Sequence, residues 1–271
     1  MGRDRRHYPR KARATTRDLD PQMVLRRWVA VARSRYAGSR MFHLVTRTWN
    51  PITGCLHGCV YCWSRRLVET RLRWITRKYR HGFKPAFHEE ELSELFKPGE
   101  FVFVSDMGDM FGDWVPEEWI MRVLDVVRRF PKTTFLFLTK NPRRYHVLKG
   151  TLCLYRNAIF GATIETDIDD LYAGHRISGA TTPSERIQCM RSLGALRKMV
   201  SIEPVIEFSN PKTFAERVAE IEPEFVYVGY DNYNNKLPEP PLSKTLELID
   251  TLRSHGIEVY EKTIRKAWWE Q

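Results

Sequence analysis

Three cysteines in one short, glycine-containing loop are the residues of this chain best suited to chemistry. Cys55, Cys59 and Cys62 have the spacing C-x3-C-x2-C, and the 271-residue chain contains only five cysteines in all. Three thiolates at this spacing can hold one iron–sulfur cluster and leave one iron without a protein ligand, whereas a structural zinc or an electron-transfer cluster normally has four protein ligands. An uncovered iron can bind a substrate or cofactor, as the open position of a catalytic zinc does. The spacing therefore predicts a catalytic iron–sulfur cluster.

Two other interpretations of these cysteines remain open. They could be ordinary core thiols, since free cysteine is often buried as a small hydrophobic residue, or they could bind zinc together with His57, His43 or a distant cysteine. The clustering of three cysteines within eight residues favours a ligand loop. Cys153 and Cys189 lie far along the chain, in a strand-like and a helix-like run, and we expect both to pack in the core.

The elements that must position this loop alternate between short apolar strands and amphipathic helices from residue 43 onward. Strands are predicted at 44–49, 101–105, 135–139, 158–164, 198–203, 225–229 and 257–261. Helices are predicted at 64–80, 89–96, 116–129, 142–149, 184–194, 211–219 and 243–255. Alternation with strands apolar on both faces predicts a parallel sheet covered by helices. Because no G-x-G-x-x-G follows a strand, a partial or complete parallel β/α (TIM-like) barrel of the α/β class is favoured over a Rossmann sheet.

Polar residues gather where the predicted strands end, and a β/α barrel places its reactive groups at the carboxyl ends of its strands and in the loops that follow. The first strand leads directly into the cysteine loop. The next five strands end in the polar stretches Ser105–Asp109, Lys140, Ile164–Thr166, Ile202–Pro204 and Tyr230–Asn232. One polar strand end is expected of any barrel, because loops are solvated, but five together predict a site at this edge.

The cysteine loop, with the aromatic Tyr61 before its last cysteine, resembles the cluster loop of the radical S-adenosylmethionine (SAM) superfamily. The lead-in TWNPITGC is similar to a branch found in phages, bacteria and archaea. Further similar stretches occur in the expected order over residues 43–265, namely FVFVSDMGDMF, FLFLTKNP, IFGATIET, PSERI, MVSIEPV and FVYVGYDN. The resemblance implies a 4Fe-4S cluster on the three cysteines, reduction of S-adenosyl-L-methionine at the open iron, and release of a 5′-deoxyadenosyl radical that abstracts hydrogen from a substrate. It also implies an external reductant such as ferredoxin or flavodoxin.

The resemblance further assigns strand-end residues to SAM. Asp106 and Ser105 lie where the superfamily binds the α-amino group, although its usual Gly-Gly-Glu is absent. Lys140 is expected at the cofactor carboxylate, with Arg186 sharing that role, and Tyr61 is expected near the adenine. An ordinary ion pair is the alternative for Lys140, and core packing is the alternative for Tyr61. The candidates for the ribose or for the substrate are Glu165, Thr166, Ser201 and Glu203.

Two segments carry an excess of positive charge. Residues 1–40 contain 12 Lys and Arg against 3 Asp and Glu, and residues 65–84 contain 8 against one, so the rest of the chain carries −5 of the total of +11. Such clustering indicates a polyanionic partner, and arginine suits phosphate geometry. The alternative is a solvated tail and a charged helix face. We expect nucleic acid, RNA or DNA, to contact residues 1–40 and the arginines Arg65, Arg66, Arg71, Arg73 and Arg77.

The sequence suggests a basic N-terminal arm and helix over residues 1–40 and one barrel domain over 41–271. Residues 1–20 have many charges and no periodicity, and a helix is predicted at 21–36. No apolar run is long enough to span a membrane, and no apolar stretch follows the basic start as in a secretory signal. Few, clustered cysteines suit a reducing cytoplasm.

The expected function is a radical SAM enzyme that acts on a nucleic-acid base or sugar, in modification or repair. One alternative keeps this chemistry but assigns a peptide, protein or small-metabolite substrate. Another is a non-catalytic iron–sulfur or zinc protein that binds nucleic acid. No Ser-His-Asp grouping, H-E-x-x-H or phosphate-loop motif indicates a different catalytic class.

Overall fold

The computed structural model describes residues 42–174 and 176–271. The chain divides into two compact units, Met1–Leu44 and Val45–Gln271. The predicted arm over residues 1–20 and the predicted helix over 21–36 lie outside the described residues. Across residues 42–174 and 176–271, no helix has both the length and the apolar character needed to cross a membrane.

The elements of the second unit follow one another in this order: β1 (Arg47–Trp49), β2 (Ile52–Thr53), α2 (Trp63–Leu67), the π-helical turn η1 (Val68–Leu72), α3 (Arg73–Ile75), the 3-10 helix η2 (Arg77–Tyr79), β3 (Ala86–Phe87), the 3-10 helix η3 (Glu89–Ser93), β4 (Phe101–Val104), α4 (Glu117–Arg129), β5 (Thr134–Thr139), α5 (Arg143–Val147), α6 (Lys149–Leu152), β6 (Ala158–Thr163), α7 (Asp169–Gly174), α8 (Pro183–Arg191), β7 (Lys198–Ile202), α9 (Pro211–Ala219), β8 (Phe225–Val228), α10 (Leu242–Ser254) and β9 (Glu258–Glu261).

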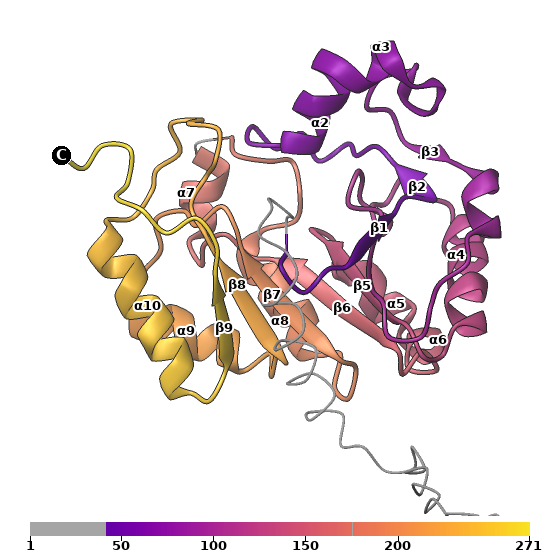
Figure 1. Ribbon diagram of the computed structural model, residues 1–271. Coiled ribbons are helices and arrows are strands. Elements are labelled where there is room, and N and C mark those ends of the chain that lie inside the picture. Colours follow the sequence, from indigo (N-terminus) through magenta and orange to yellow (C-terminus); the bar gives the residue numbers. More distant parts are fainter. Residues whose placement is uncertain (1–41, 175) are drawn as a thin grey trace, which may run out of the picture. The chain divides into compact units, whose positions relative to one another are not determined.

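Seven parallel strands form one curled sheet in the order β1-β4-β5-β6-β7-β8-β9 (Figure 1). The strand order follows the chain without reversal, so the crossover helices pack on one face, as in a TIM barrel. A doubly wound sheet would instead reverse its order at a switch point. Within the part of the chain that the structure describes, β1 and β9 do not pair with each other. The predicted α/β fold is therefore confirmed, as a partial TIM-like barrel.

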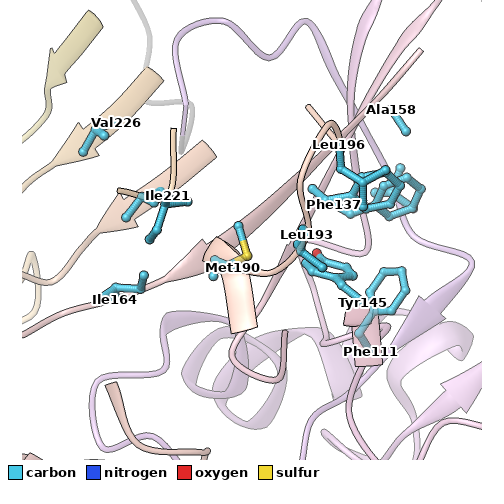
Figure 2. Close-up of a cluster of buried hydrophobic side chains, with 14 of the residues drawn as sticks. Phe111, Phe137, Tyr145, Ala158, Ile164, Met190, Leu193, Leu196, Ile221 and Val226 are labelled. Atoms are coloured by element: carbon cyan, nitrogen blue, oxygen red, sulfur yellow. The ribbon is translucent and has the colours of Figure 1, made fainter. Parts of the chain in front are cut away.

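The five inner strands, β4 to β8, are largely apolar on both faces and contain no exposed residue, as expected of parallel strands that are covered on both sides. The edge strands β1 and β9 contain exposed polar residues. Every residue of β4 and β8 is buried. Between β5, β6 and α5 the core is aromatic. Phe111 and Tyr145 pack edge to face with ring centroids 4.5 Å apart (Figure 2). The Phe137 ring stacks on the ring of Phe160, on the neighbouring strand β6. This rigid core holds the strand ends that carry the polar residues.

Helix caps explain why two of the predicted helices begin where they do. The Thr182 side chain accepts a hydrogen bond from Glu185 N at the start of α8, and Asn210 Oδ1 accepts one from Thr213 N at the start of α9. Each cap is followed directly by proline, which is favoured at the first helical position. The helices predicted at 184–194 and 211–219 are confirmed, as are those predicted at 116–129 and 243–255.

Three other helix predictions were wrong in detail. The helix predicted at 64–80 passes through the π-helical turn η1 and ends at Thr76, whose extended backbone (φ −132°, ψ 138°) breaks it. The segment predicted at 89–96 forms only the short 3-10 helix η3, and the helix predicted at 142–149 divides into α5 and α6. Helix α7 and the small antiparallel pair of β2 and β3 were not predicted, because each is too short to show a periodic pattern.

Candidate functional site

The cysteine loop begins directly after β2 and depends on two glycines with positive φ. Gly54 has a φ of +80°, and a Cβ added there would lie 2.3 Å from the carbonyl oxygen of Lys84. Gly58 has a φ of +71°. Other residues rarely adopt this conformation, so both glycines let the chain turn tightly around the three cysteines. The loop ends at α2, where Cys62 is the N-cap and its Sγ accepts a hydrogen bond from Arg65 N at 3.4 Å.

The cysteine side chains have largely apolar surroundings, and two of them also have a hydrogen-bonding neighbour. Cys55 and Cys62 pack against a cluster formed by Val68, Tyr79, Phe83 and Met107. Burial raises the pKa of the Cys55 and Cys62 thiols, so a cation is needed to hold them as thiolates at neutral pH. Cys59 is buried, and its Sγ lies 3.1 Å from Ser178 Oγ. Iron would supply that positive charge, and these features fit a thiolate-bound cluster.

The geometry gives less support to a single zinc ion. Among residues 42–174 and 176–271, no three His, Cys, Asp or Glu side chains are gathered closely enough to bind one ion. A four-iron cluster does not require such gathering, because each thiolate binds a different iron atom. His57, the nearest alternative ligand in sequence, instead has its Nε2 2.9 Å from Asp109 Oδ2. His57 could therefore complete a zinc site only by giving up its contact with Asp109.

The other two cysteines were expected to pack in the core, but neither is fully buried. Cys153 is exposed and follows α6, in the connection that enters β6 at its amino end, so the prediction of a buried strand position was wrong. Its Sγ–H donates to the carbonyl oxygen of Gly150 at 3.1 Å. Cys189 lies on helix α8, as predicted, but it is only half-buried. The cysteine loop lies at the opposite, carboxyl edge of the sheet from Cys153.

A buried Asp109–His57 pair connects the cysteine loop to two strand ends. The Asp109 carboxylate accepts hydrogen bonds from Phe111 N, from the Thr139 hydroxyl at 2.7 Å and from Lys140 N at 3.0 Å. Burial alone would raise the pKa of Asp109, but its hydrogen bonds, above all that with His57, lower it below the usual value. Asp109 therefore holds the loop and the ends of β4 and β5 in one fixed arrangement.

Four of the residues that the sequence singled out meet at one point on the inner edge of the sheet. Lys140 Nζ lies 2.6 Å from Glu165 Oε1, and Arg186 Nη1 lies 2.5 Å from Glu165 Oε2. The Tyr61 hydroxyl also donates to Glu165 Oε1, and the Lys140 ammonium lies 5.1 Å from the centre of the Tyr61 ring. The ion pair considered for Lys140 is thus present, with Glu165 as its partner. Tyr61 brings the cysteine loop into the same group.

This group has more positive than negative charge. Burial alone would raise the pKa of Glu165, but Arg186 and Lys140 lower it to about 2, so Glu165 is a carboxylate at neutral pH. Two cations and one carboxylate leave a net charge of +1 within this trio. Arg186 is fully buried, and its Nη2 has no hydrogen-bond partner among the described residues. The arrangement can therefore accept one further anion, such as a carboxylate.

Asp106 and Ser105 lie at the end of β4, against the cysteine loop. The backbone oxygen of Asp106 accepts a hydrogen bond from the Ser64 hydroxyl at 3.1 Å, and its Oδ1 accepts one from Asn50 Nδ2 at 2.6 Å. Burial raises the pKa of the Asp106 carboxyl to about 6. Ser105 has a positive φ of 57°, and its buried Oγ has no partner within the described part of the chain. Strain and an unsatisfied hydroxyl at one strand end are typical of a binding site.

The remaining cofactor or substrate candidates have different surroundings. Thr166 is buried, and its hydroxyl donates to the Glu207 carbonyl oxygen at 2.7 Å and accepts from Ile168 N, so it stabilises its own loop. Ser201 is buried on β7. Glu203 lies just after β7 with its Oε2 2.6 Å from Lys262 Nζ, and burial raises its pKa. Glu203 extends the polar edge toward β9.

The five arginines predicted to contact nucleic acid lie on the helical stretch after the cysteine loop. Arg65 and Arg73 line a cavity that also includes Cys55. Arg66 is exposed, with its guanidinium 5.4 Å from the centre of the Tyr233 ring. Arg71 and Arg77 are exposed. The structure thus places Arg65 and Arg73 in one cavity with Cys55, and it leaves Arg66, Arg71 and Arg77 exposed.

Sequence reasoning did not single out Asp109, Asn50 or Ser178 as site residues. Asp109 was visible only as one of several polar residues after β4, and Asn50 as part of the lead-in TWNP. Ser178 gave no signal, because it meets Cys59 through a loop more than a hundred residues away in the chain.

Solved structures share this fold. Spore photoproduct lyase complexed with dinucleoside spore photoproduct has a TM-score of 0.51 and 11% identity, over 78% of this chain and 75% of that chain. A variant of the lyase with bound AdoMet and the same dinucleoside has a TM-score of 0.51 and 12% identity, over 79% and 76%. SuiB of Streptococcus suis bound to precursor peptide SuiA has a TM-score of 0.51 and 10% identity, over 94% of this chain and 57% of SuiB.

At such low identity these likenesses establish a shared fold. No curated protein matches the chain in sequence. A family model does match, over residues 41–229, which include the cysteine loop, Lys140, Glu165 and Arg186. The chain therefore belongs to the family described as "Protein of unknown function (DUF5131)".

Proposed function

We propose that this protein is a radical SAM enzyme that acts on a nucleic-acid substrate, in base modification or repair. The observation that carries the proposal is the three-cysteine loop at the carboxyl edge of a half-barrel, next to a buried group with net positive charge. Spore photoproduct lyase and SuiB, which share the fold, are themselves radical SAM enzymes. In this proposal Cys55, Cys59 and Cys62 hold a 4Fe-4S cluster.

A cluster held by Cys55, Cys59 and Cys62 would pass one electron from an external reductant to SAM, which would yield methionine and a 5′-deoxyadenosyl radical. The residues of the chain bind and orient the cofactor. Lys140 and Arg186 provide the surplus positive charge for its carboxylate, and Arg186 Nη2 is the free donor. Asp106 provides an acceptor for its α-ammonium group. The apolar residues around Cys55 and Cys62 exclude water from the reactive position.

The choice of nucleic acid rests on charge. Residues 65–84, which begin three residues after Cys62, contain 8 Lys and Arg against one Glu. A segment with this excess attracts phosphates. A peptide is the second candidate, because one solved structure with this fold, SuiB, holds a precursor peptide, whereas another holds a dinucleoside photoproduct.

Cleavage of SAM tests the proposed chemistry. We expect anaerobically reconstituted, reduced protein to convert SAM to methionine and 5′-deoxyadenosine, measured by liquid chromatography. Addition of single-stranded DNA or of tRNA is expected to increase the yield if either contains the substrate, and an acidic peptide mixture serves as the comparison. Formation of methylthioadenosine, or no cleavage under strong reductant, would contradict the proposal.

The raised pKa of Asp106 predicts how cofactor binding depends on pH. The free carboxyl has a pKa of about 6 because it is buried, and only its ionised form attracts an ammonium group. We therefore expect the affinity for SAM to fall as the pH decreases from about 7 through 6. The Asp106→Asn variant should bind more weakly at pH 8 and lose this dependence, whereas Asp125→Asn, an exposed change on α4, should behave like the parent. Isothermal titration calorimetry measures both, and equal pH profiles for the parent and Asp106→Asn would refute the role of Asp106.

A further inference from the structure

The cavity beside the cysteine loop has a volume of about 590 Å³. We infer that it binds a phosphate group together with part of its nucleotide, in a single-stranded or extruded segment of nucleic acid. This inference rests on the proposed function and names the place where the substrate's backbone is held. The volume of the cavity lies within the range of small-ligand pockets, about 300–1,000 Å³.

The lining of the cavity is strongly cationic. Arg65, Arg73, Arg80 and Lys84 contribute four positive charges, and Glu69 contributes the one negative charge. Glu69 is already engaged, because its Oε2 lies 2.7 Å from Arg73 Nη1 and its Oε1 accepts a hydrogen bond from Phe83 N at 3.0 Å. The cavity therefore carries a net charge of +3, which favours an anion.

Three of these cations have no acidic partner among the described residues. Within residues 42–174 and 176–271, no carboxylate lies within ion-pair distance of Arg65, Arg80 or Lys84. Arg80 Nε donates to His81 Nε2 at 2.8 Å, which leaves the two terminal nitrogens of its guanidinium available. Planar guanidinium groups match the geometry of phosphate oxygens. By contrast, the exposed arginine Arg128 on α4 pairs with Asp125.

Residues 80–84, which form the cationic wall of the cavity, are fixed by backbone contacts with the cysteine loop and with Glu69. Gly82 has a φ of +73°, and a Cβ there would lie 2.7 Å from Glu69 Oε1. Cys55 N donates to the Phe83 carbonyl oxygen at 3.4 Å, and Gly54 packs directly against the Lys84 carbonyl group. These contacts connect the cationic wall to the cysteine loop itself. Cationic side chains that start from a fixed backbone bind a phosphate at a lower entropic cost.

Apolar side chains in and beside the cavity favour a nucleotide over a free phosphate ion. Phe83 and Leu56 line it, and Leu56 is exposed. Trp74, next to Arg73 in sequence, is 74% exposed, and the Arg73 guanidinium lies 4.8 Å from the centre of its ring. Exposed aromatic rings among cations are the usual platform for unpaired bases. A duplex would keep its bases stacked inside, so a single-stranded or flipped-out nucleotide fits better.

Oligonucleotide binding measured by fluorescence anisotropy tests this inference. A labelled single-stranded oligonucleotide is titrated with the reconstituted protein at several salt concentrations. We expect the Arg80→Ala/Lys84→Ala variant to bind about tenfold more weakly at low salt and to reduce the slope of log K against log salt by about 1.4, since each phosphate contact to a single strand contributes about 0.7. The charge-matched control is Lys132→Ala/Arg156→Ala, which removes two exposed cations in the loops that enter β5 and β6. The control should bind as the parent does.

Several outcomes would overturn the inference. These are unchanged binding by Arg80→Ala/Lys84→Ala, an equal loss in the control, displacement of the oligonucleotide by polyglutamate as readily as by unlabelled oligonucleotide, or binding of inorganic phosphate without binding of the oligonucleotide. A fall in the melting temperature of the double variant would indicate misfolding, and Arg80→Gln/Lys84→Gln then repeats the test with longer side chains retained. Cleavage of SAM by the parent protein is measured separately, so failure of the proposed chemistry is distinguishable from failure of the cavity.

Discussion

Replacement of any one of Cys55, Cys59 and Cys62 by Ala is expected to remove the visible absorbance of the reconstituted protein and to abolish 5′-deoxyadenosine formation. The physical reason is the ligand count. Three thiolates would already leave one iron of the proposed cluster uncovered, and a loop with two thiolates would hold that cluster too weakly to survive purification. Iron content, visible absorbance and product yield are measured on the same samples.

The chain offers an internal control in its other cysteines. Cys153→Ala removes an exposed thiol that donates to the Gly150 carbonyl oxygen in its own turn, and it should leave iron content and product yield unchanged. Cys189→Ala is expected to behave likewise. If the variants at 55, 59 and 62 retain full iron, the cluster assignment fails, and zinc analysis of the same samples tests the alternative metal.

The fold was predictable because its inner strands, β4 to β8, are largely apolar on both faces. A run such as FVFV or FVYV has no alternation, and a buried parallel strand is the simplest explanation. The helices with caps and full amphipathic length were likewise predicted near their true bounds. The segment after the cysteine loop was not, because the π-helical turn at Val68–Leu72 leaves no sign in the hydrophobic pattern.

The site could be predicted residue by residue but not as an arrangement. Lys140, Glu165 and Arg186 were each named from their positions at strand ends or on a helix. That Glu165 holds both cations follows only from the packing of β5, β6 and α8, which sequence spacing does not encode. Asp109 illustrates the same limit, since its four hydrogen bonds go to residues from three separate segments.

Glu165 is expected to contribute strongly to the stability of the folded protein. Its carboxylate is fully buried between Lys140 and Arg186, so the Glu165→Gln variant would leave the fully buried Arg186 and the partly buried Lys140 without a counter-charge. Removing one partner of a buried ion pair typically costs about 3–5 kcal/mol. We expect the free energy of unfolding, measured by urea denaturation at pH 7, to fall by about that amount.

The control for Glu165→Gln is Glu224→Gln, which breaks a bidentate ion pair with Arg197 at 2.7 and 2.9 Å. That pair is partly exposed, and its loss should cost about 1 kcal/mol or less. If Glu165→Gln does not fold, the double variant Glu165→Gln/Lys140→Met provides a second measurement. Removal of one of the two cations should restore part of the lost stability. A double variant as unstable as the sum of its single variants would show that the charges do not interact.

The dependence on pH gives Glu165 an independent signature. Its pKa is about 2 in the folded protein against 4.5 for the unfolded chain, so the folded state favours the ionised form. The resulting stability, about 3 kcal/mol, is present above pH 4.5 and is lost as the pH falls toward 2. Acid unfolding of the parent should therefore steepen between pH 4.5 and pH 2, and Glu165→Gln should lack this contribution because glutamine does not titrate. Parallel profiles for the two proteins in this range would contradict the assignment of Glu165 as the carboxylate that balances the two cations.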